Sequence, residues 1–228
     1  MGAGHSHGAT TPSGTAAGRH KTRLMGALAL TTIFMAVEVV GGLWTGSLAL
    51  LADAAHMLTD AGGLALALLA IRFSERPATP QKTYGYVRSE VLAALANAVV
   101  LLVLTLYILY EAYQRFLNPP EILSGPMLIV AVVGLAVNLV SMKLLSAGSS
   151  ESLNVKGAYF EVLADMLGSL GVLVAAAIVM FTGWKLADPI VGAGIGLFIV
   201  PRTWILLKQA IHILMEGTPP EIDISLVE

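Results

Sequence analysis

Six long apolar stretches limit what this chain can fold into. Each is long enough to cross a bilayer, for which about 20 residues of helix suffice, and turn residues separate them. Because 56% of the 228 residues are hydrophobic and 12% are charged, a single soluble core has no room for so much apolar surface. The sequence therefore predicts an all-α integral membrane protein with six transmembrane helices, at residues 24–44, 48–73, 91–116, 127–145, 158–181 and 190–213.

Lysine and arginine around these stretches predict how the helices are oriented. The segment before the first stretch and the second and fourth connections carry most of them, namely Arg19, Lys21, Arg23, Arg72, Arg76, Lys82, Arg88, Lys143 and Lys156. The opposite side has Arg115 and Lys185. Because short cytoplasmic loops are enriched in Lys and Arg, both termini are predicted to be cytoplasmic. The second and fifth helices then run antiparallel.

The segment before the first helix differs in composition from the rest. Residues 1–20 are rich in Gly, Ala, Ser and Thr and are predicted to be a disordered cytoplasmic tail. His5 and His7 lie in it, and they either gather metal ions weakly or are simply solvated. The chain has no cysteine, which excludes disulfides and thiolate metal sites, and its scattered basic residues exclude a nucleic-acid-binding surface.

Four ionisable residues interrupt the second and fifth apolar stretches. His56 and Asp60 are four residues apart, as are Glu161 and Asp165, so each pair shares one face of its helix. Antiparallel helices would set His56 opposite Asp165, and Asp60 opposite Glu161. An ionisable residue inside a membrane helix costs about 3 kcal/mol on insertion scales. We therefore interpret the four as functional, with a buried hydrogen-bond network as the alternative.

The types of these side chains favour a divalent metal site. Neither stretch has an internal Lys or Arg beside the three carboxylates, so the site needs a divalent cation or protons. Imidazole and carboxylate suit zinc, cobalt, cadmium, manganese or iron(II), and the missing cysteine argues against copper(I). Four protein ligands leave no position for a nucleophilic water, which favours binding or transport over hydrolysis. Since ligands must be deprotonated to coordinate, metal and protons would exchange.

Three further polar residues are candidates for an ion pathway or for contacts to the ligands. Asp53 precedes His56 by three residues on the same helix face, and it lines the exit route, positions His56 or has a helix-start role. Glu38 and Asn138 lie in the first and fourth stretches. They either line a water-filled cavity or make interhelical hydrogen bonds.

Four segments resemble the cation diffusion facilitator family, specifically bacterial cobalt-zinc-cadmium resistance efflux proteins. They are SLALLADAAHMLTD, YGYVRSEVLAAL, SLNVKGAYFEVLADMLGSLGVL and LMEGTPPEID, and the resemblance covers essentially the whole chain. It implies a six-helix, usually dimeric exporter of divalent metal ions from the cytosol, exchanging them for protons by alternating access. It also implies a transport site of paired ligands on the second and fifth helices, matching His56, Asp60, Glu161 and Asp165.

The chain departs from the family pattern in three ways. Glu161 stands where many zinc-selective relatives have histidine, which leaves the preferred metal open. The loops have no histidine for the loop metal sites of some relatives. Most members also have a cytoplasmic metal-binding domain after the sixth helix. Residues 216–228 are expected to be its truncated start, following a transmembrane domain at 21–215.

We therefore expect a proton-coupled antiporter of the cell (inner) membrane. Its substrate is a divalent metal ion, zinc first and cobalt or cadmium next, it needs no cofactor, and it forms a homodimer through the transmembrane domain. An intramembrane metalloenzyme is an alternative that HMLTD does not favour, because it lacks the HExxH arrangement. A metal-binding sensor without transport is a third possibility.

Overall fold

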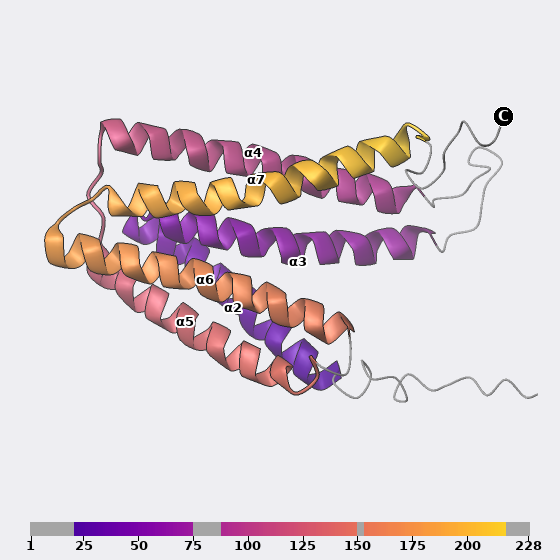
Figure 1. The fold of residues 1–228 in the computed structure, drawn as a ribbon, viewed down its shortest axis with the longest axis horizontal. Coiled ribbons are helices and arrows are strands. Elements are labelled where there is room, and N and C mark those ends of the chain that lie inside the picture. The colour runs from indigo at the N-terminus through magenta and orange to yellow at the C-terminus, as the bar shows by residue number, and fades with distance from the viewer. Residues whose placement is uncertain (1–20, 75–87, 150–152, 218–228) are drawn as a thin grey trace, which may run out of the picture.

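The computed structural model describes residues 21–74, 88–149 and 153–217, without the side chains of Lys21, Asp60, 63–74, Glu90, Leu153 and Asn154. Six helices make up nearly all of the described chain (Figure 1). They are α2 (Lys21–Thr45), α3 (Leu48–Ser74), α4 (Ser89–Leu117), α5 (Ser124–Ser146), α6 (Leu153–Thr182) and α7 (Ala187–Leu214). Each contains one predicted apolar stretch, so the six-helix prediction is confirmed.

The helices extend past their apolar stretches into polar sequence. The largest difference is at α6, which begins at Leu153 although its apolar stretch begins at residue 158. Five described helices are long and apolar enough to cross a membrane, and α3 has a shorter apolar part, Leu48–Thr59, among its described side chains. The cytoplasmic orientation of the termini stays a prediction.

The helices form two groups of three. In the first group α4 packs along α7 and both contact α3, and in the second α5 contacts both α2 and α6. Contacts of α3 with α2 and α6, and of α6 with α7, join the groups. In Figure 1 the groups lie close together at one end and diverge at the other, where α2 begins and α7 ends. We call these the closed end and the open end.

A core of small and apolar residues fills the closed end. It includes Ala49 and Leu50 of α3, Met127 of α5, Ala175 of α6 and Ala187 of α7, all at most 3% exposed. Small residues allow helices to approach closely in a membrane, where packing rather than water exclusion drives association. Four helices therefore pack closely against one another at this end.

A buried ionic network joins three helices at the same end. Asp188, in the first turn of α7, is fully buried and accepts hydrogen bonds from Ser47 Oγ (2.6 Å) and from the backbone N–H groups of Leu48 (2.8 Å) and Ala49 (3.1 Å). It thereby caps the N-terminus of α3. Arg115 of α4 lies 3.5 Å from the same carboxylate and also donates to the carbonyl of Gly46. The network fixes α3, α4 and α7 to one another.

Candidate metal transport site

Two of the predicted ligands are buried, and each has an atom without a hydrogen-bond partner. His56 of α3 is 6% exposed, and Asp165 of α6 is 5% exposed. Among the described residues, neither His56 Nε2 nor Asp165 Oδ1 has a hydrogen-bond partner. Buried polar atoms are normally paired, so both are positioned as acceptors for a proton or a metal ion. Asp60 follows one turn after His56 in α3, and its side chain lies outside the described residues.

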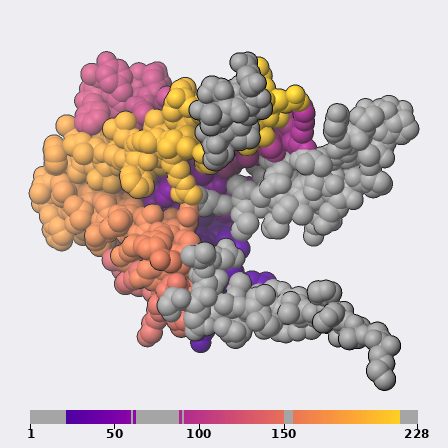
Figure 2. Space-filling model, turned by 45° about the vertical axis from the view of Figure 1, so that its right-hand side comes forward, coloured from indigo at the N-terminus to yellow at the C-terminus, as the bar shows by residue number. Residues whose placement is uncertain are grey.

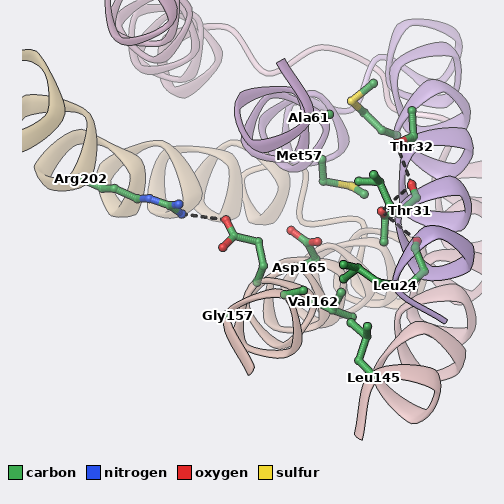
Figure 3. A pocket seen from close by; sticks show the side chains of 15 residues that line it. Leu24, Thr31, Thr32, Met57, Ala61, Leu145, Gly157, Val162, Asp165 and Arg202 are labelled. Atoms are coloured by element: carbon green, nitrogen blue, oxygen red, sulfur yellow. Dashed lines mark hydrogen bonds and ion pairs between the residues drawn. The ribbon is translucent and has the colours of Figure 1, made fainter. Parts of the chain in front are cut away.

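The third described candidate ligand, Glu161 of α6, is paired with an arginine. Arg202 Nη1 of α7 donates to Glu161 Oε1 at 3.0 Å. Figure 3 shows the Arg202 side chain reaching from α7 toward α6, where Asp165 also lies. The expectation that the carboxylates have no internal cation is therefore wrong, because a third helix supplies one. The sequence already contained the sign of this cation, because Arg202 is the one arginine in the sixth apolar stretch.

Two cavities lie beside these residues, in the half of the bundle toward the open end. The first, of about 470 Å³, is lined by Asp165, Glu161 and Arg202 together with residues of α2, α3 and α5. The second, of about 920 Å³, is lined by His56, Glu161 and Arg202 with residues of α4 and α7. In liquid water each molecule occupies about 30 Å³, so both have room for a hydrated metal ion. Figure 2 shows the surface recessed between α7 (yellow) and α6 (orange).

Glu161 and Arg202 line both cavities and so lie between them. The predicted antiparallel arrangement places His56 opposite Asp165. In the structure, His56 and Glu161 line the same cavity. His56 also contacts α7, where its ring meets the Phe198 ring edge-on with centroids 6.5 Å apart. Among the side chains that the structure describes, no three histidine or acidic groups are close enough together to hold a metal ion. The four-ligand set, which includes Asp60, stays a prediction.

The three pathway candidates meet in the interior of the bundle. Asp53 of α3 accepts a hydrogen bond from Ser169 Oγ of α6 (3.2 Å), and Asn138 of α5 donates to the same hydroxyl (3.1 Å). Glu38 of α2 adjoins the Asp53 carboxyl. Glu38, Asp53, Asn138 and Ser169, which we call the buried polar cluster, are at most 1% exposed and line neither cavity.

The contacts of the buried polar cluster bear on the roles that the sequence left open for Asp53 and Asn138. Asn138 makes the expected interhelical hydrogen bond, and Asp53 lies beyond the first turn of α3, away from the helix start. Gly168 of α6 provides space for the Asp53 carboxyl, which would collide with a Cβ at that position. Both oxygens of Glu38 lack a hydrogen-bond donor among the described residues. His5, His7 and residues 218–228 lie outside the described ranges.

Comparison with known proteins decides the family. The cation efflux transmembrane domain matches residues 24–215, a range that contains all six helices' apolar stretches and the four candidate ligands. The chain belongs to the cation efflux family. It is therefore a multi-pass membrane transporter of metal cations rather than an enzyme, and the metal is its substrate rather than a cofactor.

Several relatives are similar over almost the whole chain. The metal cation efflux system protein CzcD of Cupriavidus metallidurans is 53% identical over 228 residues, which are all of this chain and 70% of that protein. The zinc transporter ZitB of Pectobacterium atrosepticum is 44% identical over 98% of this chain and 68% of its own length. A cadmium, cobalt and zinc/H(+)-K(+) antiporter of Bacillus velezensis is 42% identical over 99% of this chain and 70% of its own.

Proposed function

We propose that this protein is a proton-coupled antiporter that exports divalent metal ions from the cytosol, zinc first and cobalt or cadmium next. The main support is that His56, Glu161 and Asp165 line cavities in the half toward the open end, while the apolar core and the Asp188 network pack the helices together at the closed end. If the termini are cytoplasmic, the open end faces the cytosol. An exporter loads its substrate from that side.

In this proposal His56, Asp60, Glu161 and Asp165 bind the transported ion. Imidazole nitrogen and carboxylate oxygen are ligands that zinc, cobalt and cadmium accept. They coordinate only when deprotonated, so a metal ion entering the site releases protons and protons entering it release the metal. The buried polar cluster extends the polar residues from Asp165 toward the closed end, and we assign it to the route beyond the metal site.

The names of the relatives mention zinc, cobalt, cadmium and protons, and so support the proposed substrates and their exchange for protons. We also propose a homodimer formed through the transmembrane domain. The division into a tail at 1–20, a transmembrane domain at 21–215 and the start of a C-terminal domain at 216–228 belongs to the same proposal.

Metal-dependent proton flux in proteoliposomes tests the proposed exchange. We expect zinc added on one side of the membrane to drive protons from the other side toward the side of addition, with cobalt and cadmium also active. Binding should tighten as pH rises, because the ligands lose their protons. A pH-sensitive dye inside the vesicles measures the flux, and protein-free vesicles are the control. Metal uptake without proton movement would contradict the coupling, and metal binding without any flux would favour a sensor.

Glu161→His is expected to shift metal preference toward zinc. The substitution replaces a hard oxygen ligand with an imidazole, which suits zinc better than it suits manganese. The ratio of zinc to manganese flux should therefore rise, by about tenfold or less, since ion choice also depends on the other ligands. The same vesicle assay, run with zinc, cadmium, cobalt and manganese, measures the ratios. An unchanged order of preference would show that Glu161 does not set selectivity.

A further inference from the structure

Arg202 is a permanent cation placed at the predicted metal site. Its side chain is 54% exposed and lines both cavities, and the Glu161 side chain that it holds is 35% exposed. A guanidinium stays protonated at any physiological pH. The positive charge therefore cannot leave by deprotonation, and it leaves Glu161 only if the side chain moves.

A bound metal ion and Arg202 would compete for the Glu161 carboxylate. As a ligand, Glu161 would bring a divalent ion within a few ångströms of the guanidinium, and like charges at such distances repel each other. Among the described side chains, no three candidate metal-binding groups gather at this site, where Glu161 is paired with Arg202. These observations favour competition for one carboxylate.

We propose that Arg202 is a tethered counter-cation, which neutralises Glu161 between transport events and is displaced from it by the incoming divalent metal ion. The inference rests on the proposed function, because it takes Glu161 as a ligand. In this role Arg202 sets the metal affinity. It also helps the metal ion to leave, because it pairs again with the Glu161 carboxylate.

The position of Arg202 on α7 links this displacement to the helix arrangement. Arg202 follows Pro201, which lies inside α7, and proline within a helix removes a backbone hydrogen bond and permits a kink. One turn before Arg202, Phe198 contacts His56. A single segment of α7 thus touches two predicted ligands. Because α7 and α6 belong to different helix groups, displacement of Arg202 also breaks a link between the groups.

An alternative role predicts the opposite effect on metal binding. A residue that hydrogen-bonds a metal ligand can hold it in the right orientation, and loss of such a partner typically weakens metal affinity by 10- to 100-fold. Removal of a competing cation instead leaves the Glu161 carboxylate available, so that the metal ion binds more tightly. The sign of the affinity change therefore distinguishes a competing cation from an orienting partner.

Titration calorimetry of zinc binding to the detergent-solubilised full chain tests the proposal. We expect Arg202→Gln to bind zinc about 3- to 10-fold more tightly than the wild type, since a partly exposed ion pair and a nearby repulsive charge are both removed. Arg202→Lys keeps the charge and should stay within about twofold. Lys208→Gln is the matched control, because this cation lies on the same helix against Trp204 and should have no effect.

Other outcomes separate the inference from the proposed function. Unchanged or weaker binding by Arg202→Gln would overturn the role of Arg202 while leaving the metal site intact. If the wild type binds no zinc, the site assignment itself fails. In a Glu161→Gln background, Arg202→Gln should no longer tighten binding, and a persisting gain would show that Arg202 does not act through Glu161. Arg202→Met repeats the test if the glutamine variant does not fold.

Discussion

Replacing Asp165 with asparagine is expected to abolish metal-dependent proton exchange and to weaken zinc binding at least about 100-fold. Asp165 is 5% exposed and lines the first cavity, and no described residue satisfies its Oδ1 atom. Asparagine has nearly the same shape but has no negative charge and no proton to exchange. Loss of a direct ligand should cost more than the 10- to 100-fold typical of residues that only support a ligand. Calorimetry and the vesicle assay measure the two losses.

A carboxylate away from the site provides the control. Glu121 lies in the connection between α4 and α5, is 88% exposed and pairs with Lys185. Glu121→Gln removes the same charge from the chain and should leave exchange within about twofold, because exposed ion pairs contribute little. Asp60→Ala should abolish exchange as Asp165→Asn does. Full exchange by either aspartate variant, in protein with normal thermal unfolding, would remove that residue from the site.

The six helices could be predicted from the sequence because the features that mark them, apolar stretches and turn residues, are local. Each apolar stretch forms one helix, and glycine and proline mark the connections, as at Gly46, which has a φ of +73°. The error at α6 has a physical cause, since residues 153–157 are only weakly apolar and sequence hydropathy cannot show that the helix continues into them. Backbone hydrogen bonding favours continuation wherever no residue stops it.

The site was only partly predictable because its key contacts are distant in the chain. The four-residue spacings identified His56 and Asp165 as residues on helix faces, and both are buried. The pairing of Arg202 with Glu161 joins residues 41 positions apart, on different helices. Hydropathy assigns a lone arginine in an apolar stretch to no particular partner. The same holds for Asp188, whose acidic side chain near a helix start suggests a cap for its own helix but caps α3 instead.

Replacing Asp188 with alanine is expected to destabilise the protein by about 3 to 5 kcal/mol. The variant leaves Arg115, which is 13% exposed, without its buried partner, and removes the acceptor for Ser47 and for two backbone N–H groups of α3. Breaking a buried ion pair by deleting one member typically costs this much, and an uncapped helix start costs about 1 kcal/mol. Thermal unfolding in detergent, converted to a free energy, measures the loss.

Two milder variants show whether the charge at the closed end matters for function as well as for stability. Glu111→Gln removes a partner that lies 3.0 Å from Arg115 but is 30% exposed, so we expect less than about 1 kcal/mol. Asp188→Asn keeps an acceptor for α3 but loses the charge. Its loss of stability should therefore lie between those of Glu111→Gln and Asp188→Ala. If the network holds α7 against α3 and α4, the loosened closed end of Asp188→Asn should raise proton leak without metal. An Asp188→Asn protein with wild-type leak and stability would mean that the apolar core alone seals this end.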